Sequence, residues 1–344
     1  MKDRIVYLSR IRALAGMAIV ILHTFTMYGM VNADSLSETE EYVTRLVPYL
    51  MMWAVPCFVM VSGVLLLDEE REIGIKKILS RYVLRILLVL LLFITLFFFL
   101  DLWMGGESFS VERLKEIPQK FFGDGSWAHL WYLYMLIGIY LLLPAFRIIA
   151  KHASNATLLY LGIILTIFVS VIPTVEKLTE NSIGFVIAIS SVFPVYLFLG
   201  YMIHKERLQL SMVQGGCLAA VGMLLILVLT IPDLGEKQAV MDKLLGNYAF
   251  LPVMLLSVGC FVLLRGRGMP GVRAAKVWGF LDRYSFGIYL THLIYLRFLI
   301  RVIKWNPLEY GSFWMLIPVA VGAYAAALLT TMLLKLIPGI RKLL

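Results

Sequence analysis

The chain has 344 residues, of which 61% are of hydrophobic types and only 15% are charged. Average soluble proteins hold about 45–50% apolar and about 25% charged residues, so a water-soluble body of this composition would expose too much hydrocarbon. The formal charge of +9 reflects 31 Lys and Arg against 22 Asp and Glu. These positive residues fall in short runs between long apolar stretches, without a basic stripe interleaved with aromatics. This pattern excludes a nucleic-acid-binding protein and indicates a polytopic membrane protein.

Ten apolar runs are long enough to cross a bilayer, which takes about 20 residues. In chain order they cover 11–31, 45–67, 82–101, 129–147, 156–174, 183–203, 212–231, 247–264, 284–303 and 312–336. A short amphipathic helix is expected at 111–122, between the third and fourth runs. The predicted fold is therefore an all-α polytopic membrane protein, with about ten transmembrane helices in one bundle that forms a single domain over residues 1–344.

The distribution of Lys and Arg between the connecting segments predicts the orientation. Most of these residues fall on one side of the membrane if both termini are cytoplasmic, which is the arrangement that the positive-inside rule favours. The three cysteines stand singly inside apolar runs, so neither a disulfide framework nor a metal site with cysteine ligands is expected.

Ionisable residues inside membrane spans are expensive and are functional candidates by default. Arg12 and His23 lie eleven residues apart in the first span. At about 100° per residue, this separation makes three full helical turns plus only about 20°. The two side chains therefore share one helix face, about 16 Å apart along the axis at about 1.5 Å per residue. We expect Arg12 at the cytoplasmic mouth and His23 near the membrane midplane.

This pair favours a long, thin substrate with an anionic head and a reactive tip. A fork-shaped, permanently charged guanidinium suits phosphate, and a deep imidazole suits proton transfer. Coenzyme A, with a thioester at the end of its pantetheine arm, has this shape. The alternative is that Arg12 is a positive-inside anchor that extends to the lipid headgroups and that His23 is a hydrogen-bonded packing residue.

Several segments together resemble the acyltransferase 3 family of integral-membrane enzymes. The Arg and His separated by ten residues in the first span match the hallmark of that family, and four further stretches agree in order and position. They are Pro56–Gly63 ending in Ser-Gly, Arg81–Ile86 with its basic pair, His129–Leu133 with a His-x-Trp-aromatic-Leu pattern, and Tyr284–His292 with a Ser-x-Gly-x-Tyr-x-x-His pattern. The resemblance covers residues 5 to 335.

The resemblance implies a multi-pass enzyme of a bacterial plasma membrane. It would move an acetyl or other short acyl group from cytoplasmic acyl-CoA, by default acetyl-CoA, to a hydroxyl of an extracytoplasmic glycan, glycolipid or related acceptor. No permanently bound cofactor and no metal are expected. The acceptor, the acyl group and the oligomeric state are left open by the sequence.

The resemblance also implies roles for the basic residues of the first and third spans. Arg12, Arg81 and Arg85 would gather at the cytoplasmic mouth and hold the phosphates of acyl-CoA. His23 would act as general base on the acceptor hydroxyl or would carry the acyl group as a nucleophile. For Arg81 and Arg85, positive-inside anchoring is the competing interpretation.

Two departures from the family pattern bear on these roles. Members usually carry Asp where this chain has Ser9, so another group must place Arg12 if that carboxylate does so elsewhere. Arg81 and Arg85 have three intervening residues where two are usual. In an α-helix this i,i+4 spacing still keeps both side chains on one face.

A third group of residues is predicted to line the acceptor site. It comprises His129, Trp131 and Tyr132 at the outer end of the fourth span, and Tyr289 and His292 three residues apart in the ninth. Sugars pack well against flat aromatic rings with a polar edge. The competing interpretations are an interfacial aromatic belt for the first three and an interhelical contact for the last two.

Two other classes of protein fit parts of the same pattern. A transporter or flippase of an amphiphilic glycan or lipid would use a similar cavity without covalent chemistry, although the sequence shows no internal repeat. An enzymatically silent sensor derived from the family is a third hypothesis, for which Ser9 is the one indication.

Overall fold

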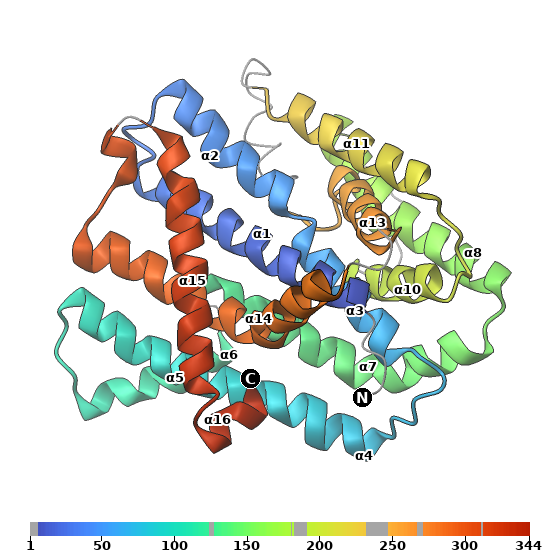
Figure 1. The fold of residues 1–344 in the computed structure, drawn as a ribbon, viewed down its shortest axis with the longest axis horizontal. Coiled ribbons are helices and arrows are strands. Elements are labelled where there is room, and N and C mark those ends of the chain that lie inside the picture. Colours follow the sequence, from blue (N-terminus) through green and yellow to red (C-terminus); the bar gives the residue numbers. More distant parts are fainter. Residues whose placement is uncertain are drawn as a thin grey trace.

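The computed structural model describes residues 6–123, 127–179, 181, 191–231, 247–266, 271–310 and 312–344. Within these ranges every regular element is helical and no strand occurs. Figure 1 shows the helices packed into one bundle. The prediction of an all-α polytopic membrane protein is confirmed.

The principal α-helices are α1 (Val6–Val31), α2 (Glu38–Met51), α3 (Ala54–Leu66), α4 (Ile75–Lys77), α5 (Leu84–Gly105), α6 (Glu116–Phe122), α7 (Trp131–His152), α8 (Asn155–Thr166), α9 (Ile172–Thr179), α10 (Phe193–His204), α11 (Met212–Leu229), α13 (Leu251–Gly266), α14 (Val272–Phe298), α15 (Leu316–Leu334) and α16 (Pro338–Leu343). Short 3-10 turns cover Val111–Lys115, Ala128–Leu130, Pro307–Tyr310 and Phe313–Met315. π-helical turns cover Ile78–Val83, Ile167–Val171 and Leu299–Ile303. The short helix predicted at 111–122 is confirmed as a 3-10 turn that continues into α6.

Eight continuous helical segments of the described chain are long and apolar enough to cross a membrane. They are Val6–Val31, Glu38–Leu66, Ile75–Gly105, Ala128–His152, Asn155–Thr179, Met212–Leu229, Val272–Ile303 and Phe313–Leu334. Two shorter apolar helices, α10 and α13, coincide with the other two predicted spans. The first part of the predicted span 183–203 lies outside the described residues. A multi-pass architecture follows, and the number of ten crossings stays a prediction.

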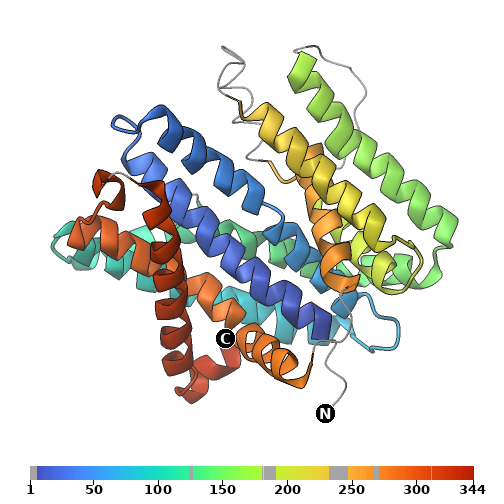
Figure 2. The same cartoon turned by 45° about the horizontal axis from the view of Figure 1, so that its top comes forward.

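Helix α1 lies at the centre of the bundle and organises its packing. It packs against α2, α3, α14 and α15, and Figure 2 shows α2 running alongside it. Because α1 is apolar on most of its circumference, it buries residues on several faces, as is typical of a core helix. Outer helices such as α11 and α15 instead expose large apolar side chains, including Leu224 and Leu329. That exposure is expected where lipid covers the protein.

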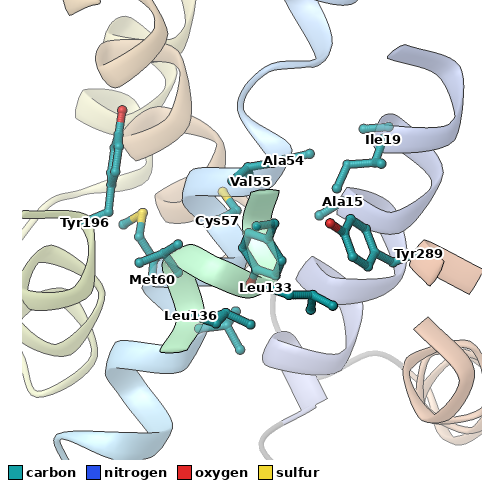
Figure 3. Packing of buried hydrophobic residues seen from close by; sticks show 14 of the residues in the cluster. Ala15, Ile19, Ala54, Val55, Cys57, Met60, Leu133, Leu136, Tyr196 and Tyr289 are labelled. Atoms are coloured by element: carbon teal, nitrogen blue, oxygen red, sulfur yellow. The ribbon is translucent and has the colours of Figure 1, made fainter. Parts of the chain in front are cut away.

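Glycines allow the central helices to approach closely. A Cβ atom added at Gly63 of α3 would collide with the backbone of Leu197 in α10, and one added at Gly200 would collide with Met60. These two glycines therefore let α3 and α10 pack closely. Figure 3 shows the resulting core, where Cys57 and Met60 of α3 lie among residues of α1, α7, α10 and α14.

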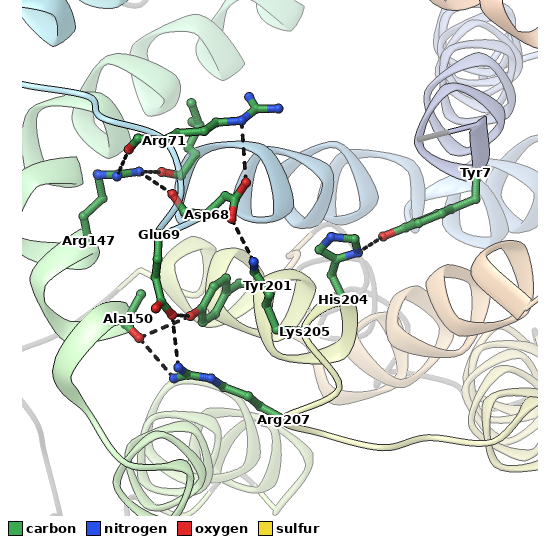
Figure 4. Close-up of polar contacts among 11 residues, drawn as sticks. Tyr7, Asp68, Glu69, Arg71, Arg147, Ala150, Tyr201, His204, Lys205 and Arg207 are labelled. Atoms are coloured by element: carbon green, nitrogen blue, oxygen red, sulfur yellow. Dashed lines mark hydrogen bonds and ion pairs between the residues drawn. The ribbon is translucent and has the colours of Figure 1, made fainter. Parts of the chain in front are cut away.

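A polar network closes the end of the bundle where α3, α7 and α10 meet the loop 67–74 (Figure 4). Arg147 of α7 donates hydrogen bonds to the backbone carbonyls of Leu66, Asp68 and Arg71. Lys205 donates to the Asp68 carboxylate at 2.8 Å. Burial raises the pKa of Asp68, but the hydrogen bond from Lys205 and the charges of Lys205 and Arg71 outweigh it and hold that pKa below its ordinary value.

The start of α1 and the end of the chain lie at the same end of the bundle. Arg12 and Leu344 line one cavity, and Arg85 donates from Nε to the carbonyl of Leu343 at 2.8 Å. This arrangement agrees with termini on one side of the membrane. The side that this end faces stays a prediction.

Candidate active site

A cavity of about 280 Å³ lies between α1, α3, α5, α7 and α14. Three arginines line it, namely Arg12, Arg85 and Arg283, together with the carboxylate of Asp282. The cavity wall therefore carries an excess of positive charge, which raises the local concentration of anions. Two of the three arginines are among the residues predicted to bind phosphate.

Arg12 is held from the side by a carboxylate of α14. Its Nε lies 2.8 Å from Oδ1 of Asp282, and its Nη2 lies 3.1 Å from Oδ2. Ser9, one turn earlier on α1, donates a hydrogen bond to the same Oδ2 at 2.8 Å. The side chain of Asp282 is 2% exposed, whereas that of Arg12 is 30% exposed. The carboxylate that contacts Arg12 therefore belongs to Asp282, 273 residues away in sequence from Ser9.

The structure brings Arg85 to this cavity but not Arg81. The guanidinium of Arg85 lies 5.5 Å from the ring centre of Phe286, and Arg85 lines the cavity. Arg81 is exposed and is not among the described residues that form the wall. The expectation that both share one face assumed α-helical spacing, but Arg81 lies in a π turn, where hydrogen bonds run from i to i+5. The third arginine is Arg283, which no sequence motif indicated.

Aromatic residues form the wall between the arginines and the deeper part of the protein. Tyr132 and Tyr140 of α7 and Tyr289 of α14 line the cavity, and the rings of Tyr132 and Tyr289 have their centres 5.5 Å apart. The hydroxyl of Tyr289 donates to the carbonyl of His129. Because His292 lies one turn beyond Tyr289 on α14, this wall leads from the cations to a group of imidazoles.

His23, His129 and His292 converge from α1, the turn before α7, and α14. The ring centre of His23 lies 5.2 Å from that of His292 and 6.3 Å from that of His129, and the latter two are 5.5 Å apart. His129 and His292 are buried, while His23 is half-buried. Among the described residues, no set of three or more His, Cys, Asp or Glu side chains has the geometry of a metal site.

The hydrogen bonds of the two buried imidazoles determine where their lone pairs lie. Nδ1 of His292 is 2.7 Å from the carbonyl oxygen of Tyr289 and 3.1 Å from that of Ile288. Since a carbonyl only accepts, a neutral ring carries its proton on Nδ1 and its lone pair on Nε2. Nε2 of His129 is 3.4 Å from the carbonyl of Leu290, so by the same argument its lone pair is on Nδ1.

Both of these lone-pair nitrogens, Nε2 of His292 and Nδ1 of His129, are buried and have no hydrogen-bond partner among the described protein atoms. Buried polar groups without a partner are uncommon and costly. Two unpaired acceptors beside His23 fit a ligand group that donates hydrogen bonds, such as a hydroxyl.

Trp131 lies apart from this group. It is 38% exposed and packs on Phe193 and Tyr248, with ring centres 5.7 and 5.4 Å away. The indole that approaches the imidazoles is that of Trp127, whose ring centre is 6.3 Å from that of His129. The structure therefore brings together four of the five residues predicted for the acceptor site, and Trp131 meets this set at Tyr132, with ring centres 6.2 Å apart.

A family model described as an acyltransferase domain, Acyl_transf_3, matches residues 5–336. This match covers nearly the whole chain. The protein belongs to the acyltransferase 3 family. It is accordingly a multi-pass membrane protein with an acyltransferase domain. No curated protein and no solved structure matches the chain.

Two residues of α14 that line the cavity were missed in the sequence. Asp282 is the sole acidic residue of the apolar span Val272–Ile303, and a carboxylate in such a span is a functional candidate. The predicted start of that span at residue 284 left Asp282 and Arg283 in the preceding loop. A span boundary placed one turn earlier would have identified both.

A second missed group lies beyond the imidazoles. Trp127 stacks on Phe97 with ring centres 3.9 Å apart and donates from its indole nitrogen to Asp101 at 2.9 Å. Arg297 pairs with Asp101 at 2.8 Å and lies over the Trp127 ring. This network fixes the indole and the ring of Phe97 against His129, so it supports the imidazole group from the side remote from Arg12.

Proposed function

We propose that this acyltransferase moves an acetyl or other short acyl group from cytoplasmic acyl-CoA to a hydroxyl of an extracytoplasmic envelope glycan or glycolipid. The observation that carries the proposal is the face that α1 turns toward α14. On that face Arg12 lines a cationic cavity and His23 contacts two further imidazoles, about 16 Å away along the helix axis. One substrate reaching from the first group to the second must be long, thin and anionic at its head.

The donor would enter with its phosphates among the arginines. Guanidinium groups form charge-assisted, often bidentate hydrogen bonds with phosphate oxygens, and three of them line the cavity. The pantetheine arm would then run past Tyr140, Tyr132 and Tyr289, whose rings offer apolar faces and polar edges. The thioester would then lie next to His23.

At the thioester, His23 would take the proton of the acceptor hydroxyl. The oxygen attacks the thioester carbonyl, a C–O bond forms, the C–S bond breaks, and the departing thiolate of coenzyme A accepts the proton. In a second route the His23 nitrogen attacks first and carries the acyl group to the hydroxyl in a separate step. The two routes use the same residues, and trapping of an acyl-enzyme in the absence of acceptor distinguishes them.

The acceptor would approach the imidazoles from the opposite side of the membrane. The unpaired lone pairs of His129 and His292 support this, because a sugar hydroxyl is a hydrogen-bond donor. Tyr132, Tyr289 and, further out, Trp131 would supply aromatic contacts. We place the enzyme in the bacterial plasma membrane with both termini in the cytoplasm.

The proposal is tested with the purified full chain in lipid nanodiscs. Radiolabelled acetyl-CoA is added with and without fractionated envelope glycans, and label in the glycan fraction is counted. Wild-type protein and the matched control His152→Ala should transfer label, because His152 is exposed at the end of α7. His23→Ala should not.

The transporter hypothesis predicts the opposite outcome. A flippase would move a labelled glycan or lipid across proteoliposomes without acetyl-CoA, and no acyl group would become attached. Equal transport by wild type and His23→Ala, with no transfer of label from acetyl-CoA by either, would overturn the enzymatic proposal.

A further inference from the structure

Asp282 stands out in the cavity because it is a carboxylate in a wall that would bind phosphates. It is buried, whereas the arginines of the same wall are partly exposed. A negative charge in that position repels a polyphosphate, so its presence requires a compensating role. Its contacts supply one, since both carboxylate oxygens face α1.

The ion pair between Asp282 and Arg12 restrains the guanidinium from one side. Oδ1 approaches Nε at 2.8 Å and Oδ2 approaches Nη2 at 3.1 Å, so the carboxylate lies along one edge of the fork. An arginine otherwise loses considerable side-chain entropy when it is immobilised by a ligand. A guanidinium already held along one edge loses less of it on binding, which favours affinity.

Ser9 completes the arrangement from the helix that carries Arg12. Its hydroxyl donates to Oδ2 of Asp282 at 2.8 Å, and it precedes Arg12 by three residues, the spacing at which helix side chains are neighbours. A carboxylate at position 9 would lie one helical turn from Arg12 and beside position 282, so exchanging the charge and the hydroxyl within this pair is a direct test of the contact.

We infer that Asp282 is a positioning residue that orients the Arg12 guanidinium toward the phosphates of the donor. This inference rests on the proposed function, because it concerns the donor end of the same site. Asp282 does not touch the reacting atoms. It acts on the affinity for acyl-CoA through Arg12.

The experiment exchanges the two side chains. Asp282→Asn removes the charge with little change of shape, and Ser9→Asp combined with Asp282→Ser moves the carboxylate onto α1. For each variant, binding of coenzyme A is titrated, kcat and KM for acetyl-CoA are measured, and thermal stability is recorded in the same nanodiscs. Ser9→Ala serves as a control that removes only the supporting hydroxyl.

Asp282→Asn should weaken coenzyme A binding and raise KM by about tenfold to a hundredfold, the loss typical of a misplaced binding group, with a smaller change in kcat. The double variant should recover most of this loss. A purely structural tie between α1 and α14 predicts otherwise: lower stability in both variants, and no recovery of affinity when the carboxylate moves.

The inference is overturned if Asp282→Asn binds coenzyme A as wild type does, or if the exchange restores stability without affinity. Failure of the proposed function gives a different result, since wild-type protein itself would then neither bind coenzyme A nor transfer the acyl group.

Discussion

The two ends of the face shared by α1 and α14 satisfy their polar groups in different ways. At the Arg12 end, the guanidinium is paired with a buried carboxylate and partly exposed. At the His23 end, the neighbours are two buried imidazoles whose lone pairs have no partner among the described protein atoms. The guanidinium is therefore placed where solvent reaches it and beside a carboxylate that pairs with it, and hydrogen-bond acceptors are placed where an unpaired charge would be expensive. The first arrangement suits binding of an anion, and the second suits transfer of a proton.

Substituting one residue at the Arg12 end and one at the His23 end tests this difference most directly. His23→Ala should lower kcat by about 10²–10⁴-fold, the range for loss of a general acid–base, and should leave KM for acetyl-CoA nearly unchanged. Arg12→Lys keeps the positive charge but lacks the planar guanidinium that can donate two parallel hydrogen bonds to a phosphate. It should therefore mainly raise KM for acetyl-CoA. Steady-state kinetics of both variants against His152→Ala check this. A rise in KM without loss of kcat in His23→Ala would contradict the assignment.

Two substitutions of His292 by amide side chains of different length test the role of its lone pair. His292→Asn places its amide near the position of Nδ1 and leaves no acceptor at that of Nε2, whereas His292→Gln reaches the Nε2 position with an oxygen. His292→Asn should therefore lose about tenfold to a hundredfold in kcat, and His292→Gln should lose less. Measured turnover with saturating acetyl-CoA decides between them. Equal losses in the two variants would indicate a packing role.

Arg283 lines the cavity, whereas the sequence pattern had selected Arg81 for the same group of arginines. Arg283→Ala should raise KM for acetyl-CoA by about tenfold, which corresponds to loss of a charge-assisted hydrogen bond, and the effect should shrink at high salt. Arg81→Ala should change KM by less than about twofold, because Arg81 is exposed outside the cavity wall. Titration of both variants with coenzyme A at two salt concentrations tests this. A larger loss of affinity in Arg81→Ala than in Arg283→Ala would show that Arg81, rather than Arg283, contacts the donor.

The smallest effect is expected outside the site, at Asp68. Its pKa is depressed in the folded protein, so its contribution to stability is present above the ordinary aspartate value of about 3.9 and is lost as pH falls through the folded pKa. Asp68→Asn should cost less than about 1 kcal/mol near neutral pH, because the pair with Lys205 is partly exposed. Thermal unfolding of both proteins across a pH series checks this. A difference that grows on acidification would contradict it.

Sequence patterns located the helices and one face of α1 correctly because both depend on local geometry. Apolar runs of spanning length reflect the cost of exposing backbone to lipid, and the spacing of Arg12 and His23 follows from the turn of a single helix. The position of Arg81 failed because a π turn changes the spacing rule, and nothing in the run of residues marks that turn.

By itself, the sequence determined that lipid must surround this protein, that its opening helix presents a guanidinium and an imidazole on one side, and that its motifs are those of a membrane acyltransferase family. Only the tertiary structure decided which residues meet that side. Asp282 and Arg283 join Arg12, and His129 and His292 join His23, across separations of more than 100 residues. Such pairings depend on how whole helices pack against one another, because the rotation and depth of α14 relative to α1 are set by the combined packing of their neighbours rather than by either segment alone.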